Sequence, residues 1–518
     1  MTRYPWLAFA VIATLLVLHA QLFLGYAVDD AFITLRYADN LRHGLGLTFN
    51  PGERVEGFTC PLFVVIEAGL LALGANGVVA AKLLGIACGI GTIGLTMRLA
   101  LRLTNSVPAA ALAGLTLAVQ PAFAVACVNG LETALFAFWI AAAFDLWQSP
   151  PSERTSTLLG ATLAAAFLTR PEGALATAII GADFLRRKRP LTRFVASFLL
   201  IAGPLFLRKA AYYHSWTPNT ALAKLPPLSW MRIRSGFAYV ADFSETHWEI
   251  VGYAALLWLA IRRREPFISL VVFAFVWLGY VVFTGGDWIP RGRFLIPTLP
   301  LLAVGLAAGV QSVRWVGQWI PFAFAGLAVL LTGWMDLRVT LPWVNSMSLG
   351  TVRARGGVAE WLKAAVPPDT VIATLDVGLI AYETGMRVID TGGLTDTAIA
   401  RVIHDHPGVY TGHLIFPDNR AAEHIAHLTM AHKPDVLVLH VRGELPKMSP
   451  TQLRTAGLYP QDQALLDDKT VRREYRWVCS NLADKDSGEE HRYNVLVRMG
   501  LPLRTQPSVD SEGHVACF

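Results

Sequence analysis

The sequence predicts a polytopic α-helical membrane protein that ends in a soluble α/β domain. Of its 518 residues, 54% are hydrophobic and only 16% are charged, whereas soluble globular proteins carry roughly 25% charged residues. Apolar runs long enough to cross a bilayer recur over the first two thirds of the chain. A soluble protein cannot bury so many such runs, because its helices need a polar face. We therefore predict a membrane domain over residues 1–338 and a soluble domain over residues 339–518.

Basic residues between the apolar runs predict the orientation of the membrane domain, because cytoplasmic loops are enriched in lysine and arginine. The basic clusters are Arg3, Arg98 with Arg102, Arg154, Arg186–Arg189 with Arg193, Arg262–Arg264, and Arg314. With all of them in the cytoplasm, about eleven membrane helices fit, at 6–25, 79–101, 107–126, 132–148, 157–170, 173–185, 194–211, 250–261, 267–284, 295–312 and 318–338. This threading predicts a multi-pass inner-membrane protein with a cytoplasmic amino terminus and a C-terminal domain on the outer side of the membrane. The first apolar segment lacks a small-residue cleavage site, so we expect an uncleaved signal anchor.

The exoplasmic segments are then 26–78, 127–131, 212–249, 285–294 and the tail. Within the first of them, Pro61–Leu73 is too short for a span and carries Glu67, which favours a helix lying on the membrane surface. In the tail, Thr370–Leu375, Val388–Asp390, Asp435–His440 and Tyr493–Met499 are predicted as strands, with a helix over Val352–Ala365.

Charge and cysteine usage exclude some functions. The tail from residue 341 holds 18 basic and 21 acidic residues, so the basic excess belongs to the membrane domain, where it reports orientation. The sequence has no basic stripe with interleaved aromatic residues, so we do not expect it to bind nucleic acid. Cys479 and Cys517 both lie in the tail, where either a disulfide or two free thiols is compatible with an oxidising compartment.

The first exoplasmic segment begins with two adjacent carboxylates, Asp29 and Asp30. In hydrocarbon each would cost about 2.5–3.5 kcal/mol, so both are expected to face water, a cation or a substrate. A carboxylate can take the proton from an acceptor hydroxyl in glycosyl transfer. The pair could instead hold a divalent cation that neutralises a phosphate leaving group, although no cofactor is required by the sequence. A solvated helix end is the simpler alternative.

Further charged groups lie at the same expected level. Arginine suits phosphate because its planar fork donates several hydrogen bonds and stays charged, so Arg170, Arg291 and Arg293 are candidates for binding a lipid phosphate, with Lys224 as a fourth. The expected supporting charges are Arg36, Glu56, Glu132, Glu172 and Asp287. Interfacial anchoring or ordinary ion pairs would also explain these residues. Sugar or acceptor contacts are expected from His214, Trp216 and Asn219, and for Trp216 a membrane-interface position is the plainer alternative.

Several motifs resemble a known family. The segments DDAFITLRYADNLRHGLGLTFNPGERVEGFT, NGLET, TRPEG, PNTALAK and GGDWIPRGRF, together with ATLDVGLIAYETGMRVIDTGGLTD and HKPDVLVLH in the tail, are similar to the terminal arabinofuranosyltransferases of mycobacterial cell-wall assembly and their bacterial relatives. These belong to the GT-C class of membrane glycosyltransferases. Where the family has Tyr-Thr-Asn, this chain has Phe58-Thr59-Cys60, which indicates a divergent acceptor.

The resemblance implies a GT-C membrane bundle with a periplasmic α/β domain. It implies transfer of a sugar such as arabinofuranose from a polyprenyl-phosphate donor to a cell-surface glycan or glycoprotein, with Asp29 or Asp30 as the catalytic carboxylate. A ligase or transporter of preassembled lipid-linked glycan is the alternative. The clustering of polar residues on one face argues against a transporter, which needs them through the bilayer depth. A non-catalytic assembly protein is a third hypothesis.

Overall fold

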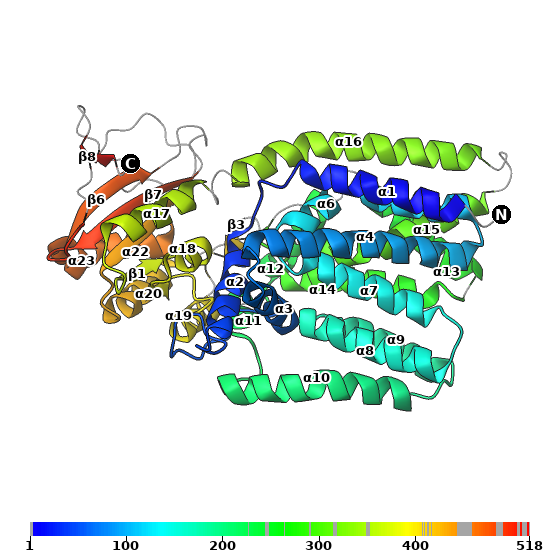
Figure 1. Cartoon of the computed structure of the whole chain (residues 1–518), viewed down its shortest axis with the longest axis horizontal. Coiled ribbons are helices and arrows are strands. Elements are labelled where there is room, and N and C mark those ends of the chain that lie inside the picture. Colours follow the sequence, from blue (N-terminus) through cyan, green and yellow to red (C-terminus); the bar gives the residue numbers. More distant parts are fainter. Residues whose placement is uncertain are drawn as a thin grey trace.

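In a computed structural model, a bundle of long helices lies beside a mixed β-sheet that is flanked by shorter helices (Figure 1). The described residues are 4–225, 227–243, 248–263, 265–289, 292–313, 319–348, 353–406, 408, 410–411, 414–415, 417–442, 458–482, 491–504, 508–509 and 515–516.

Every segment predicted to cross the membrane is helical. The bundle helices are α1 (Tyr4–Gln21), α4 (Gly77–Thr104), α5 (Val107–Ala118), α6 (Pro121–Val128), α7 (Thr133–Trp147), α8 (Glu153–Thr169), α9 (Gly173–Arg186), α10 (Thr192–Tyr213), α13 (Trp248–Arg263), α14 (Ile268–Thr284), α15 (Leu299–Ser312) and α16 (Ile320–Ser348). A 3-10 helix, η2 (Arg293–Thr298), leads into α15.

One predicted span is divided in two. Helices α5 and α6 meet at an angle of 63°, because Pro121 lacks the backbone N–H that a continuous helix would use. Among the described residues, four helical segments are long and apolar enough to cross a membrane, or five with this bent pair. The chain is therefore a helical membrane protein, and the count of eleven spans stays a prediction.

Small residues allow the central helices to approach closely. A Cβ atom added at Gly85 of α4 would lie 2.2 Å from the carbonyl oxygen of Cys127 in α6, and one added at Gly89 would lie 2.5 Å from the Cys127 sulfur. Helix α4 is also capped at its first turn, where the Asn76 side chain accepts a hydrogen bond from the Val79 amide (3.1 Å).

Four short helices lie at the end of the bundle that faces the sheet (Figure 1). They are α2 (Asp29–Arg42), α3 (Pro61–Ala72), α11 (Asn219–Lys224) and α12 (Trp230–Phe243). The sequence predicted α3 but left the segment 212–249 without helices. The Glu67 side chain of α3 is buried rather than exposed at a surface.

The sheet has the strand order β2-β1-β5-β7-β6, in which β2, β1 and β5 are parallel and β7 and β6 are antiparallel to their neighbours. Its strands are β1 (Val371–Thr374), β2 (Arg387–Asp390), β5 (Val436–Arg442), β6 (Tyr475–Leu482) and β7 (His491–Arg498). The flanking helices are α17 (Gly356–Ala365), α18 (Val377–Thr384), α19 (Thr397–Asp405), α20 (Asn419–Ala431), α22 (Pro460–Asp467) and α23 (Lys469–Glu474). Two two-stranded pairs are β3 (Tyr410–Thr411) with β4 (Leu414–Ile415), and β8 (Ser508–Val509) with β9 (Val515–Ala516).

The predicted strands correspond to β1, β2, β5 and β7, whereas β6 was not predicted. The predicted domain boundary at 338/339 falls inside α16, which continues to Ser348. The change from bundle to sheet therefore comes after Ser348.

The first loop joins the bundle to this sheet. The Asn50 side chain pairs with both backbone groups of Val388 in the edge strand β2, at 2.8 and 3.1 Å. Glu53 forms an ion pair with Arg387 of the same strand (2.8 Å). The edge of β2 is thus covered by residues that lie more than 300 positions earlier in the chain.

Candidate functional site

Asp30 lies where three separate segments meet. Its carboxylate accepts hydrogen bonds from the Lys224 ammonium of α11 (3.0 Å) and from the indole N–H of Trp288 (3.2 Å). Burial alone would raise the pKa of Asp30, but the positive charges of Lys224 and Arg293 and these hydrogen bonds hold it below its usual range. Asp30 is therefore an ionised carboxylate at neutral pH.

Asp29 points elsewhere. Its two carboxylate oxygens accept hydrogen bonds from the backbone amides of Gly378 (2.9 Å) and Leu379 (3.1 Å) in the first turn of α18. The Arg355 side chain lies 3.8 Å from the same carboxylate. Burial raises the pKa of Asp29, while Arg355 and the two amides oppose that rise. Asp29 thus satisfies otherwise unpaired helix donors and fixes the first loop to the tail.

Arg170 is enclosed by carboxylates. It bonds to Glu132 (2.6 Å) and Glu172 (3.0 Å), and the Tyr280 hydroxyl donates a second bond to Glu172 (2.8 Å). Its guanidinium also lies 4.9 Å from the ring centre of Phe294. The cluster ties together the loops after α6 and α8 and the helix α14.

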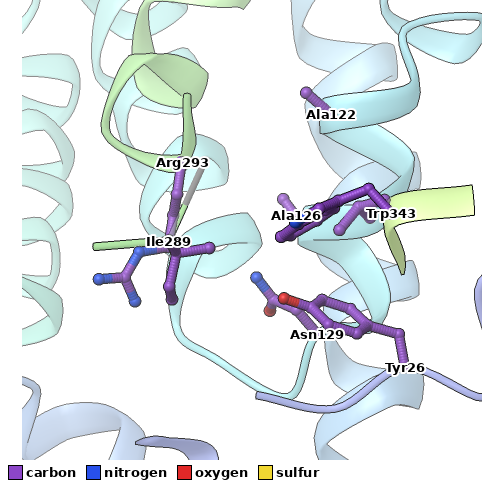
Figure 2. Close-up of a pocket in the computed structure, with 8 residues that line it drawn as sticks. Tyr26, Ala122, Ala126, Asn129, Ile289, Arg293 and Trp343 are labelled. Atoms are coloured by element: carbon purple, nitrogen blue, oxygen red, sulfur yellow. The ribbon is translucent and has the colours of Figure 1, made fainter. Parts of the chain in front are cut away.

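Arg293 borders a small pocket. Figure 2 shows Arg293 and Ile289 on one side of this pocket and Tyr26, Asn129 and Trp343 on the other. Arg293 is held by Asp287 at 2.5 Å. The cavity has a volume of about 20 Å³, which is room for a single water molecule.

Glu56 and Asn219 lie beside this region but are already engaged. Glu56 is buried next to Lys209 (3.0 Å), and burial, partly offset by Lys209, raises the pKa of Glu56 to about 7. The Asn219 amide nitrogen donates to the carbonyls of Gly393 (2.8 Å) and Leu394 (3.0 Å), so it joins the start of α11 to the tail.

The remaining predicted residues have different positions. His214 ends α10 in the left-handed conformation and is exposed. Trp216 is 65% exposed and its ring centre lies 5.8 Å from that of Phe206. The buried Arg36 donates to the carbonyls of Phe49 (3.2 Å) and Gly385 (2.8 Å) and supports the junction with the tail.

Two predictions fall outside the described residues. Arg291 is one of them, and the disulfide between Cys479 and Cys517 is the other.

The two adjacent aspartates do not fit a shared cation in this arrangement. Both oxygens of Asp29 accept amide hydrogens, whereas Asp30 is bonded to an ammonium and an indole. Among the described residues, no group of three or more His, Cys, Asp or Glu side chains is placed to hold a metal ion.

Sequence reasoning missed several residues of the site. Trp288 lies inside the motif GGDWIPRGRF, next to a predicted site residue, so that motif was the available signal. Arg355 gave no signal, because its buried partners, Asp29 and Asp376 (2.7 Å), become its neighbours only in the fold. Asp376 in turn accepts a hydrogen bond from the Tyr493 hydroxyl (2.7 Å) and lies 2.8 Å from His440.

Comparison with known proteins gives relatives for both parts of the chain. Residues 347–495 match a family described as a domain of unknown function, DUF8728. The terminal beta-(1->2)-arabinofuranosyltransferase of Corynebacterium glutamicum is 29% identical in an alignment of 367 positions that covers 60% of this chain and 49% of that protein. The enzyme of the same name from Mycobacterium tuberculosis is 28% identical in an alignment of 369 positions that covers 60% of this chain and 57% of that protein. The chain thus spans about half the length of the curated relatives it matches.

Two solved structures share the fold. ArnT from Cupriavidus metallidurans bound to undecaprenyl phosphate has a TM-score of 0.61 at 15% identity, covering 96% of this chain and 99% of that one. The oligosaccharyltransferase of Archaeoglobus fulgidus has a TM-score of 0.57 at 12% identity, covering 95% and 74%. The expected resemblance is therefore confirmed: the chain has the fold of GT-C membrane glycosyltransferases and is similar in sequence to terminal arabinofuranosyltransferases.

Proposed function

We propose that this protein is a glycosyltransferase that transfers a pentofuranose, such as arabinofuranose, from a polyprenyl-phosphate donor to a glycan or glycoprotein acceptor on the periplasmic side. The observation that carries the proposal is the ionised Asp30, which is held between Lys224 and Trp288 where the loops of the bundle converge. The similarity to terminal arabinofuranosyltransferases supports the sugar, and the undecaprenyl phosphate bound to ArnT supports the donor class.

In this mechanism Asp30 acts as the general base. Its carboxylate takes the proton of the acceptor hydroxyl while that oxygen bonds to the anomeric carbon of the sugar. The bond between the anomeric carbon and the phosphate oxygen breaks at the same time, and polyprenyl phosphate leaves with the electron pair. Asp29 is not available for this step, because both of its oxygens are bonded to the amides of α18.

Lys224 and Arg293 are the cations that we assign to the donor phosphate. Both lower the pKa of Asp30 in this structure, which makes it a weak base. A phosphate anion bound beside them would share their positive charge and would itself repel the carboxylate. The basicity of Asp30 would then rise only when the donor is in place, which would limit reaction to the complete complex.

Arg170 receives a positioning role rather than direct phosphate binding. Two carboxylates, Glu132 and Glu172, already neutralise its charge and use its donors. Removal of this arginine would leave buried carboxylates unpaired, which is costly. We therefore expect Arg170 to hold the loop ends in place, with Glu132 and Glu172 as its partners.

Donor binding also requires side chains to move. A cavity of about 20 Å³ beside Arg293 cannot hold a sugar phosphate. Tyr26 and Trp343 form the opposite side of this pocket (Figure 2), so their displacement would open it toward Asn129 and Arg293.

The test is the Asp30→Asn variant of the full chain. We expect it to fold normally and to lose transfer from a polyprenyl-phosphate pentofuranose by about a hundredfold or more, since a positioned base contributes about that much. Asp39→Asn is the matched control, because Asp39 lies on the same helix and pairs with Arg42 on its surface. The readout is mass analysis of the glycosylated acceptor and of the released lipid.

The donor panel separates the alternatives. It includes several polyprenyl-phosphate monosaccharides and a preassembled lipid-linked oligosaccharide, because the oligosaccharyltransferase fold is also similar. Transfer of the oligosaccharide alone would replace the proposal by a ligase. Full activity of Asp30→Asn would remove Asp30 from the mechanism.

A further inference from the structure

A second cavity lies at the end of the bundle opposite the sheet. It has a volume of about 350 Å³. The residues that line it belong to the ends of α7, α8, α9 and α10, and Figure 1 shows where these helices lie. Its walls combine apolar side chains, including Trp147, Leu159 and Phe184, with the cations Arg189 and Arg193 and one carboxylate, Glu153. The size is within the range of ligand sites, and no part of the proposed transfer reaction uses it.

Arg189 is held in this cavity without a carboxylate partner among the residues that the structure describes. Its guanidinium lies 4.7 Å from the ring centre of Trp147. That ring is fixed in turn, because its N–H donates to Asp183 (2.9 Å) and it packs on Phe184 at 4.8 Å. The aromatic platform positions Arg189 but leaves its positive charge unneutralised.

The neighbouring arginines differ from Arg189 in this respect. Arg186 and Arg187 both form ion pairs with Asp183 and with Glu265. Asp183 and Glu265 are therefore already paired with these two cations.

Arg193 can be released for a ligand. It contacts Glu153 at 3.3 Å, but the two side chains are 63% and 80% exposed, and ion pairs of this kind contribute little. Arg193 belongs to the first turn of α10, which has neither an acidic residue nor a capping side chain. The amides of that turn add partial positive charge beside the guanidinium.

The wall that α10 forms continues into an exposed apolar surface, which suits the acyl chains of a lipid. On α10, Val195, Leu199 and Leu200 are 39%, 56% and 76% exposed. Side chains that are three, four or seven positions apart share a helix face. Val195 and Leu199 therefore lie on the same face of α10 as the cavity residue Thr192, and Leu200 lies on the same face as the cavity residue Arg193. A cationic cavity thus leads into an exposed apolar track.

From this arrangement we infer that the cavity binds the phosphate-bearing head group of an anionic phospholipid, whose acyl chain lies along α10. The phosphate contacts Arg189 and Arg193, and the hydroxyls of Ser152 and Thr192, which also line the cavity, can bond to the head group. Basic pockets between membrane helices suit such head groups because phosphate, charge and hydrocarbon are recognised together. A soluble phosphate compound has the same charge but would leave the apolar track unused.

The experiment compares four forms of the full chain in nanodiscs of phosphatidylcholine with a minor fraction of phosphatidylglycerol. Native mass spectrometry measures how much phosphatidylglycerol each form retains. Each basic side chain is expected to contribute about a fivefold preference, so Arg189→Gln with Arg193→Gln should retain about 25-fold less phosphatidylglycerol. The matched pair Arg154→Gln with Arg262→Gln removes two cations predicted on the same side of the membrane but outside the cavity, and should retain as much as the unmodified protein.

The Ser156→Trp variant keeps every charge and fills the cavity, so it should also lose the lipid. It separates a shaped site from general charge attraction and remains informative if the arginine variant does not fold. Equal retention by all forms would overturn the inference, as would equal loss in the matched pair.

A second arm adds inorganic phosphate or glycerol 3-phosphate to the detergent-solubilised protein and measures its thermal unfolding. No stabilisation by these compounds supports the lipid assignment. A stabilisation that depends on Arg189 and Arg193, without retained phosphatidylglycerol, would overturn it in favour of a soluble phosphate ligand.

Discussion

Asp29 and Asp30 are neighbours in the chain, but their carboxylates serve different parts of the molecule. Asp30 contacts Lys224 and Trp288 of the bundle end, whereas Asp29 binds the first amides of α18 in the tail. Successive side chains on a helix lie about 100° apart, so adjacent residues at its first turn point in different directions. The sequence alone could not show which of the two aspartates is the better candidate for the catalytic carboxylate.

This difference predicts distinct results for the two asparagine variants. Asp29→Asn should lower the stability of the tail junction by about 1–3 kcal/mol. One of the two hydrogen bonds from the α18 amides is lost, and Arg355 loses a buried opposite charge. Asp30→Asn should change stability much less, because its carboxylate is partly exposed and its neighbours include an ammonium that can reach water. Thermal unfolding of the purified proteins measures both. An unchanged unfolding temperature for Asp29→Asn would contradict its structural role.

A buried acid in the tail predicts a pH dependence. Asp462 accepts a hydrogen bond from the His440 amide (3.0 Å), and burial raises its pKa to about 8, with Asp376 adding to the rise and the amide opposing it. The folded protein therefore keeps this proton at pH values where the unfolded chain, with a pKa near 3.8, has lost it. The contribution of Asp462 to stability falls as pH rises from about 4 to about 8.

Asp462→Asn should remove this loss of stability with rising pH, because the asparagine side chain is uncharged, like that of the protonated acid. We expect the unfolding temperature of the variant to fall less than that of the unmodified protein as pH rises from about 4 to about 8. Parallel curves for the two proteins would show that Asp462 is ionised in both states.

At the scale of elements, the contact between α2 and α18 decides how the tail meets the bundle. Gly378 begins this contact, and a Cβ atom added there would lie 1.9 Å from the Asp29 carbonyl oxygen. The obstacle is backbone, so α18 would have to move away from α2. Only glycine fits the present approach.

Gly378→Ala should therefore destabilise the protein by about 1–3 kcal/mol and make the tail more accessible to proteases. Gly356→Ala is the matched control, since nothing lies within 4 Å of its added Cβ and it also begins a helix, α17. Limited proteolysis with thermal unfolding gives the comparison. Equal behaviour of the two variants would mean that α18 adjusts without cost.

At the scale of the whole molecule, the charged side chains gather at two opposite ends of the helical bundle. The loops that the basic clusters predicted to be exoplasmic meet at Asp30 and Arg170, as the contacts from Lys224, Trp288 and Glu132 show. The opposite end holds its own pairs, such as Arg102 with Asp145 at 3.2 Å. Which of the two ends faces the cytoplasm stays a prediction.

Cysteine labelling tests that orientation in intact cells. Lys469→Cys on the exposed surface of the tail should react with a membrane-impermeant maleimide added from outside. Arg154→Cys at the other end should react only after the cells are permeabilised. Both variants are made with Cys479 and Cys517 replaced by serine, and the native Cys60, Cys88 and Cys127 are buried and should contribute little background. Labelling of both positions from outside would overturn the predicted topology.

The helical membrane architecture and the positions of its helices followed from the sequence, because apolar length and the spacing of basic residues are local properties of the chain. The same holds for strands β1, β2, β5 and β7, whose apolar residues are consecutive. Local patterns failed where the signal was weak, as in β6 and α12, and where Pro121 divided a single apolar run.

The partners of each charged residue were decided only by the tertiary structure. Arg355 meets Asp29 and Asp376, and Asn219 joins the tail instead of remaining free for a sugar, because folding brings together segments that are distant along the chain. Ion pairing and burial depend on such distances, whereas hydrophobic periodicity does not. The sequence by itself therefore determined which residue types lie at the end of the bundle, and only the tertiary structure assigned Asp30 and Asp29 their different neighbours.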